Sequence, residues 1–316
     1  MRRGVVDTLR RGFDNTFANW PVLALRLAES VLFLVLAVGT AFLVLLPILV
    51  SVGIHVADLI SPEEIASAAT LLLQKWVLLI WVFVAVTALL GLLMAIHSFV
   101  QAACARVYVD ADRIAGPDST GARSRFKVFS LQRWLAGGAA GWWTVFLLYN
   151  LAWGAAGLLL FIPLLPTLIL MVVFRESAPA LLATGCIGLL ITLLLMIVVG
   201  FATAMWTNRS IAAWAARHHG ARDALAEGWR ALRLDLGRHL LVAIIVLVVT
   251  VAGSAFFASF SFFAALGETV GGDSGAFLLM TLPLRIVGSV LSSVFSAIVT
   301  SWYLASYSAI AVEAEG

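Results

Sequence analysis

The chain has 316 residues, of which 62% are hydrophobic and 12% charged, and its mean hydropathy is +1.05. Because soluble domains carry about 25% charged residues, this composition excludes an ordinary soluble domain and indicates a protein surrounded by lipid. The net charge of +3 does not indicate a nucleic-acid partner, since no binding module accompanies the basic residues and loops that face an anionic leaflet explain the same charge.

Six apolar blocks along the chain are long enough to cross a membrane, which takes about 20 helical residues. They are 22–53, 76–100, 137–165, 179–206, 239–265 and 276–310. Lipid offers no partner for an unpaired backbone N–H or C=O, so each block should be a helix. We therefore predict an all-α polytopic protein in which 1–316 is one integral membrane domain and six transmembrane helices form three hairpins. The apolar stretch 164–174 either continues the third helix or is re-entrant, and the sequence leaves both open.

Basic residues are distributed unevenly between these blocks. Sixteen of the 20 lie in three segments, near the N-terminus, between the second and third blocks, and between the fourth and fifth. Positively charged loops stay on the cytoplasmic side of a membrane. We therefore expect a multi-pass protein of the bacterial inner (plasma) membrane with both termini in the cytoplasm.

Each predicted hairpin follows a basic, amphipathic stretch. The stretches are an N-terminal interfacial helix at 1–21 and cytoplasmic amphipathic segments at 102–136 and 207–238. In the first, apolar residues recur at helical spacing at Val6, Leu9, Phe13, Phe17 and Trp20, and in the third they recur at Leu225, Trp229, Leu232 and Leu236. Such stripes are typical of helices that lie in the membrane interface. The basic residues predicted to contact lipid headgroups there are Arg10, Arg11, Arg125, Lys127, Arg222, Arg230 and Arg233.

Two charged residues fall deep inside predicted membrane helices. Glu29 and Arg285 each lie about nine residues from opposite membrane surfaces, which at about 1.5 Å per residue places both near the middle of the bilayer. A charge there is expensive unless it is paired or hydrated. A Glu29–Arg285 pair between the first and last helices is geometrically reasonable. A structural clamp is one interpretation, a local Arg26–Glu29 contact at i, i+3 is another, and a role in solute transport is the third.

Further polar residues in the membrane helices extend the second interpretation. The last helix carries hydroxyls at helical spacing, namely Ser289, Ser293, Ser296 and Thr300. Such a stripe suits close helix packing, and it would also suit a hydrated path that ends at Arg285. Asn150 in the third helix is a polar group for which we expect a partner on another helix.

No catalytic or cofactor motif stands out. The sequence has no phosphate-binding glycine loop, no His-Glu-x-x-His and no Cys-x-x-Cys, so we expect no enzyme activity, no cofactor and no metal. His55 and Asp58 are two potential ligands without a third, which is weak evidence for a metal site. His97 should bond to Gln101 or to a backbone carbonyl.

The run from Gly220 to Arg233 (GARDALAEGWRALR), directly before a membrane helix, resembles a segment of a known group of proteins. These are uncharacterised bacterial six-helix membrane proteins akin to the membrane domain of some glycerophosphodiester phosphodiesterases. The aromatic spacing Phe13-x-x-x-Phe17-x-x-Trp20 is similar in style. The resemblance implies the six-helix topology. It carries over no functional residue, because the catalytic phosphodiesterase domain is missing.

Together these patterns favour a non-enzymatic membrane subunit that organises or assembles partner proteins or lipids. Its expected partners are lipids of the anionic cytoplasmic leaflet and either another membrane protein or further copies of itself. The alternative is a transporter or channel for a small, anionic solute that uses Arg285 and Glu29.

Overall fold

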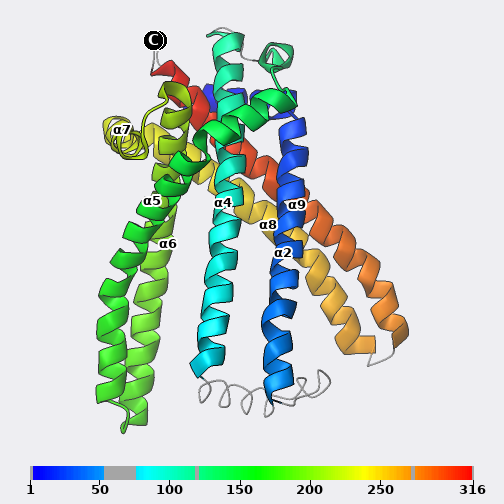
Figure 1. Cartoon of the computed structure of the whole chain (residues 1–316), viewed down its shortest axis with the longest axis vertical. Helices are drawn as coiled ribbons and strands as arrows, with labels where there is room; N and C mark the ends of the chain where they lie inside the picture. Colours follow the sequence, from blue (N-terminus) through cyan, green and yellow to red (C-terminus); the bar gives the residue numbers. More distant parts are fainter. Residues whose placement is uncertain (1–2, 53–75, 118–120, 272–274, 315–316) are drawn as a thin grey trace. The chain divides into compact units, whose positions relative to one another are not determined.

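The structure is a computed structural model that describes residues 3–52, 76–117, 121–271 and 275–314 (Figure 1). The side chains of 45–52, 261 and 263–280 are not part of this description. His55 and Asp58, the potential metal ligands, lie outside the described residues.

The described residues form helices and no β-strand. The α-helices are α1 (Val5–Ala18), α2 (Pro21–Val52), α4 (Trp76–Ala115), α5 (Leu131–Val173), α6 (Ala178–Arg217), α7 (Ala221–Leu234), α8 (Leu236–Gly271) and α9 (Gly275–Glu313), with a 3₁₀ turn, η2, at Arg123–Phe126. In this part of the chain, six helices are long and apolar enough to cross a membrane: α2, α4, α5, α6, α8 and α9. The prediction of an all-α membrane protein with six such helices is confirmed.

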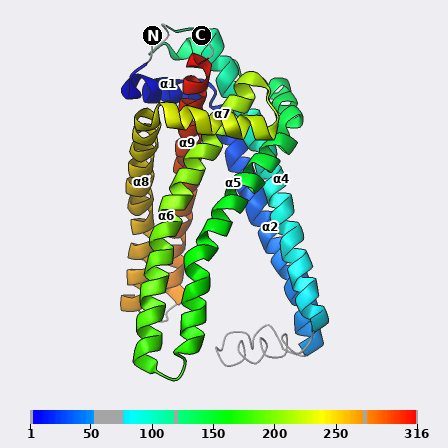
Figure 2. The same cartoon turned by 90° about the vertical axis from the view of Figure 1, so that its left-hand side faces the viewer.

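Contacts group the chain into two compact units, Met1–Ala24 with Ser98–Gly316 and Leu25–His97. We call them the first and second units. In the first unit α5 packs against α6 and α8 packs against α9, while α1 lies on α9 and α7 on α6. Figure 2 shows α1 and α7 crossing the long helices of this unit near the end where the C-terminus lies. We call this the core end of the first unit.

Three long helices, α4, α6 and α9, have mostly buried side chains in their C-terminal parts. The 40 residues of α4 extend about 60 Å at about 1.5 Å per residue, roughly twice the thickness of the hydrocarbon core of a bilayer. Its residues from Ser98 onward are mostly buried, and so are residues 203–216 of α6 and 301–311 of α9. These buried stretches are rich in alanine and serine, whose small side chains let helices approach closely. The remaining parts of α6 and α9 carry exposed apolar side chains suited to lipid.

The prediction of a second interfacial helix, directly before the third membrane helix, is wrong. α4 continues to Ala115, the described residues between it and α5 contain the short η2 and no further helix, and α5 begins at Leu131. Gly116 has a positive φ of 75° and precedes Pro117, and both features end a helix. Tertiary contacts then hold the backbone extended, since the Asn19 side chain accepts hydrogen bonds from the amides of Val128 and Phe129.

The stretch 164–174 continues the third membrane helix. α5 runs through Pro163 and Pro166 to Val173, so the chain does not re-enter the membrane there. The Thr167 hydroxyl donates a 2.7 Å hydrogen bond to the Pro163 carbonyl. Such side-chain bonds help a membrane helix tolerate proline.

α1 turns its polar side chains toward the protein. Arg11, Asp14 and Asn15 are buried, whereas Val6 is 74% exposed and Phe13 is also exposed. The prediction that Arg11 contacts lipid headgroups is therefore wrong. Its side chain is 0% exposed, because partners distant in the sequence surround it.

The buried Arg11 guanidinium is well satisfied. Its Nε donates to Asp112 Oδ1 at 3.0 Å, and its terminal nitrogens donate to the carbonyls of Gly116 at 2.9 Å and Pro117 at 3.2 Å. The Phe126 ring lies 5.1 Å from the guanidinium carbon. Good geometry and additional hydrogen bonds are what allow a buried ion pair to offset the loss of hydration.

Neighbouring contacts extend this attachment of α1. Asn15 donates to the Tyr108 carbonyl at 2.8 Å, and Trp302 donates to the Leu9 carbonyl at 2.8 Å. A Cβ atom at Gly12 would come within 2.8 Å of the Ser306 backbone nitrogen, so only glycine allows α1 to lie this close to α9.

Replacing Asp112 by Asn should leave the Arg11 charge buried without its carboxylate. We expect the free energy of unfolding to fall by about 3–5 kcal/mol, measured by denaturant titration of the purified protein in detergent. The control Asp110→Asn removes a more exposed carboxylate that lies 3.9 Å from Arg106 and Arg113, and should cost about 1 kcal/mol or less. Equal losses in the two variants would contradict a special role for the buried pair.

Candidate functional site

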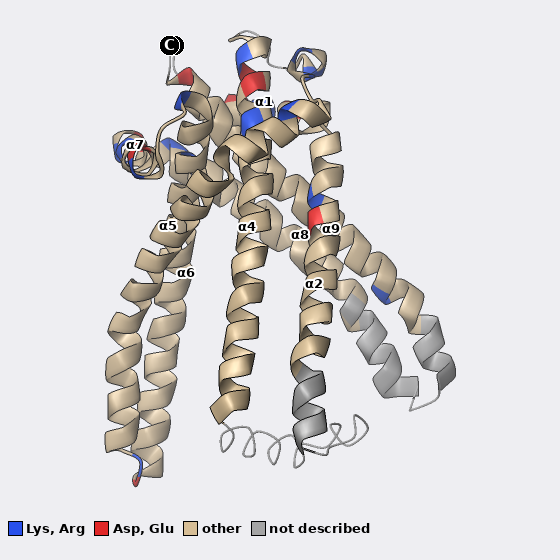
Figure 3. Ribbon diagram, in the orientation of Figure 1, with Lys and Arg blue, Asp and Glu red and all other residues tan. Residues whose placement is uncertain are grey.

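Charged side chains of the first unit gather at its core end, around α1 and α7 (Figure 3). Of the seven basic residues predicted to contact headgroups, six are exposed there: Arg10, Arg125, Lys127, Arg222, Arg230 and Arg233. Arg11 is the exception described above. The remaining basic residues at this end include several that bind protein groups.

Two arginines of α4 cap the C-terminal end of α6. Arg106 donates to the Ala215 carbonyl at 2.7 Å, and Arg113 donates to the Ala216 carbonyl. The last carbonyls of a helix have no partner within it and carry partial negative charge, so these contacts are favourable. Partial burial and the charges of Arg106 and Arg113 lower the pKa of His218, which follows α6 in a left-handed conformation.

Glu29 of the second unit has a partner that the sequence did not indicate. Its Oε1 atom lies 2.8 Å from Nδ1 of His97, and the Glu29 side chain is buried. This contact links α2 to α4 within the second unit. Arg285 belongs to the first unit, so the predicted Glu29–Arg285 pair is not described and stays a prediction.

The polar residues predicted along the last helices lie on exposed surfaces. Ser289, Ser293, Ser296 and Thr300 are all exposed, and Arg285 is partly buried. The Ser293 hydroxyl donates to the Ser289 carbonyl of its own helix at 2.9 Å. Asn150 is also exposed and donates to the Phe146 carbonyl on α5 itself, not to another helix.

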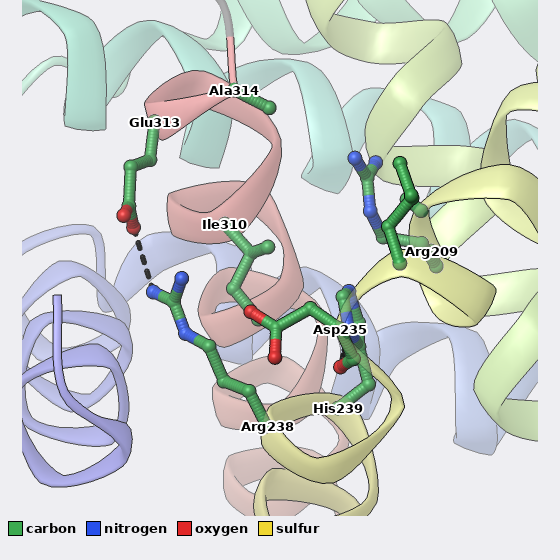
Figure 4. Close-up of a pocket in the computed structure, with 9 residues that line it drawn as sticks. Arg209, Asp235, Arg238, His239, Ile310, Glu313 and Ala314 are labelled. Atoms are coloured by element: carbon green, nitrogen blue, oxygen red, sulfur yellow. Dashed lines mark hydrogen bonds and ion pairs between the residues drawn. The ribbon is translucent and has the colours of Figure 1, made fainter. Parts of the chain in front are cut away.

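A cavity of about 290 Å³ opens where α6, α7, α8 and α9 meet at the core end, and we call it the polar cavity because charged side chains are part of its lining. Its lining residues come from all four helices and their connections: Arg209, Ala231, Leu234, Asp235, Arg238, His239, Ile310, Glu313 and Ala314. Figure 4 shows Arg238 and Glu313 on one side of this cavity and Arg209 on the other. Leu234 is 74% exposed and Arg209 only 1%, so the cavity leads from the surface to a buried cation.

On one side of this cavity, Arg238 and Glu313 form an ion pair. Arg238 donates to Glu313 at 2.6 Å and to the Thr8 hydroxyl at 2.8 Å, while the Arg3 amide donates to the same carboxylate at 2.8 Å. These contacts join α1, α8 and α9. The charges of Arg238 and Glu313 are thus matched within the protein.

The opposite side holds polar atoms without partners. Within the described part of the chain, Nε and Nη1 of Arg209 and Nε2 of His239 are buried and accept or donate no hydrogen bond. The carboxylate of Glu227 acts on Arg209 only at a distance, because Glu227 pairs with Arg217 at 2.8 Å and His219 at 3.1 Å. Buried polar atoms of this kind are rare in native proteins and call for an explanation.

Sequence reasoning did not find this cavity. Arg209 and Arg238 lie in the amphipathic segment 207–238, and no sequence motif indicates a role for either residue. The spacing of Asp235, Arg238 and His239 at i, i+3 and i+4 places them on one helix face and was an available signal. Nothing local in the sequence brings Glu313, near the other end of the chain, to the same place.

A second hollow, of about 500 Å³, is almost entirely apolar and lies between α5, α6 and α7. Ala152, Leu159, Val199 and Trp229 are among its lining residues. Trp206 forms part of its wall and donates to the Leu225 carbonyl at 2.9 Å. This hydrogen bond attaches α7 to α6 at the wall of the apolar hollow.

Comparison with known proteins assigns no activity to these features. No protein family matches the chain, and neither a curated protein nor a solved structure is significantly similar to it. The resemblance to six-helix membrane proteins therefore stays a prediction. Among the described residues no group of three or more His, Cys, Asp or Glu residues is arranged to hold a metal ion.

A double-mutant cycle tests whether Glu29 and His97 stabilise the second unit together. We expect Glu29→Gln and His97→Gln to be non-additive in the free energy of unfolding, with a coupling of about 0.5–3 kcal/mol, because each removes the same contact. The exposed Asn150→Leu should add to Glu29→Gln without coupling. Additive effects of the first two changes would show that the contact contributes nothing to stability.

Proposed function

We propose that the protein is a non-enzymatic integral protein of a bacterial inner membrane that organises lipids or partner proteins. Of these two, the contacts favour lipids. The proposal includes the topology expected from the sequence, with three membrane hairpins, both termini in the cytoplasm, and α1 and α7 in the cytoplasmic interface. The core end of the first unit is then its cytoplasmic end.

The observation that carries the proposal is the orientation of α1. An amphipathic helix of a soluble protein buries its apolar face, whereas the buried residues of α1 are mostly polar, with Leu9 among them, and Val6 and Phe13 are exposed. Exposed apolar residues on a helix end that also carries arginines suit the boundary between headgroups and acyl chains. Trp20, just after α1, is exposed too and is a residue type that prefers this layer.

α7 provides the complementary positive surface. Arg222, Arg230 and Arg233 are exposed on it, next to the exposed ring of Trp229. A basic residue near an anionic leaflet contributes about 1 kcal/mol of attraction. The apolar hollow under Trp229 offers space beside these charges for an acyl chain. The arrangement therefore suits recruitment of anionic lipids around the protein.

The alternative function is transport of a small, anionic solute through Glu29 and Arg285. Its structural support is weaker. The Glu29 carboxylate already contacts His97. Ser289 and Ser293 are exposed and do not line a described cavity. Midplane charge in a transporter would be expected to face a hydrated path.

Lipid retention tests the proposed function. The protein is reconstituted in vesicles of phosphatidylcholine and phosphatidylglycerol, extracted with a mild detergent, and its retained lipids are quantified. We expect phosphatidylglycerol to be enriched several-fold over the bulk mixture. The triple variant Arg222→Gln, Arg230→Gln and Arg233→Gln should lose most of this enrichment, because about 1 kcal/mol is lost for each charge.

The matched control for this experiment is Arg175→Gln. Arg175 is exposed in the turn between α5 and α6, at the other end of the first unit, and its loss should leave the enrichment unchanged. Equal retention of both lipids by the unmodified protein would contradict the proposal. A stoichiometric protein partner without lipid enrichment would favour assembly of proteins instead.

Cysteine labelling tests the proposed orientation. In a Cys186→Ser background, in which Cys104 is buried, Ser124→Cys and Gly220→Cys should react with a membrane-impermeant maleimide only in inverted membrane vesicles. Arg175→Cys should react in intact spheroplasts, because it lies at the opposite end of α5 and α6. The reverse pattern would overturn the orientation.

A further inference from the structure

On the buried side of the polar cavity, the described protein supplies no hydrogen-bond acceptor for two nitrogen atoms of the Arg209 guanidinium. Arg209 is cationic at neutral pH and 1% exposed, and its Nε and Nη1 atoms have no acceptor in the described chain. Two carboxylates of this region already have basic partners: Glu313 pairs with Arg238, and Glu227 pairs with Arg217. A buried charge without a partner is strongly unfavourable, so an external oxyanion would be bound favourably here.

The other side chains of the cavity specify a second property of the ligand. Nδ1 of His239 lies 2.8 Å from the Asp235 carbonyl, which is an acceptor, so Nδ1 carries the hydrogen. In the neutral ring Nε2 is then an acceptor, and this atom is buried without a partner. A ligand that fits must offer a hydroxyl donor as well as negative oxygens.

We propose that this cavity binds a phosphate group that carries a hydroxyl, with Arg209 holding its negative oxygens and His239 Nε2 accepting its hydroxyl hydrogen. Charge-assisted bonds from a guanidinium suit phosphate oxygens. At about 290 Å³ the cavity is at the lower limit of small-molecule sites, which are about 300–1,000 Å³. It accommodates inorganic phosphate or the headgroup of a phosphomonoester lipid, and not a whole lipid.

This site is separate from the exposed arginines of the proposed lipid-organising function. Arg222, Arg230 and Arg233 lie outside the cavity lining. The lipid-retention experiment and the experiment below therefore fail independently of each other.

The test measures the ligand-dependent rise in the Tm of the full-length protein in a neutral detergent, in buffer without phosphate or sulfate. Inorganic phosphate should raise the Tm of the unmodified protein more than sulfate does at the same concentration, because sulfate has no hydroxyl hydrogen at neutral pH. Arg209→Met should weaken phosphate binding by about tenfold or more, as expected for the loss of a charged hydrogen bond. His239→Phe should remove most of the preference for phosphate over sulfate.

Two further variants keep the result interpretable. Ala231→Phe fills the cavity while retaining Arg209, and should abolish binding even if Arg209→Met does not fold. Arg133→Met removes an exposed arginine elsewhere in the first unit and should leave phosphate binding unchanged. A Tm shift that persists in Ala231→Phe, or that is lost equally in Arg133→Met, would overturn the assignment.

A second ligand tests whether the bound phosphate group belongs to a lipid or to a soluble molecule. Dioctanoyl phosphatidic acid has a phosphomonoester headgroup with a hydroxyl, whereas dioctanoyl phosphatidylcholine has neither a net charge nor a hydroxyl on its phosphate. Binding of phosphatidic acid without binding of inorganic phosphate assigns the site to a lipid headgroup, and the opposite result assigns it to a soluble phosphate. If neither ligand binds, or if sulfate binds as tightly as phosphate, the proposal is wrong.

Discussion

The buried ion pair between Arg11 and Asp112 joins the start of the chain to the end of α4, and much of the core end depends on it. Both side chains are almost completely buried, so neither charge can be hydrated if the other is lost. The pair fixes which face of α1 points inward. With Arg11 held inside, Thr8 meets Arg238 of α8 and the Leu9 carbonyl meets Trp302 of α9.

This constraint explains how one protein combines two kinds of packing. Toward the core end, α6 and α9 are buried through small residues and polar contacts, as in a soluble protein. Away from it they expose long apolar side chains, which suit a lipid surrounding. The core end can therefore hold charged groups at positions that lipid would not allow. Arg11 and Arg209 are both buried there, but only Arg11 has its donors matched by the protein.

Sequence patterns predicted the parts of the fold that depend on local composition. The six apolar helices and the short helices α1 and α7 follow from block length and helical spacing. The predicted helix before α5 is absent, because contacts with Asn19 hold that stretch extended. The candidate sites were harder to predict: Glu29 meets His97, 68 residues away, and Arg209, Arg238 and Glu313 converge from three different helices.

The sequence by itself determined that the protein has six helices suited to lipid and that its basic residues lie in the segments between them. Hydrophobicity and helical period are properties of neighbouring residues, so they can be read along the chain. The tertiary structure decided which arginines are exposed, which are buried and which of them form ion pairs. Identical side chains such as Arg10 and Arg11 differ in burial because α1 packs with one face on α4 and α9, and partners about a hundred residues away set that face.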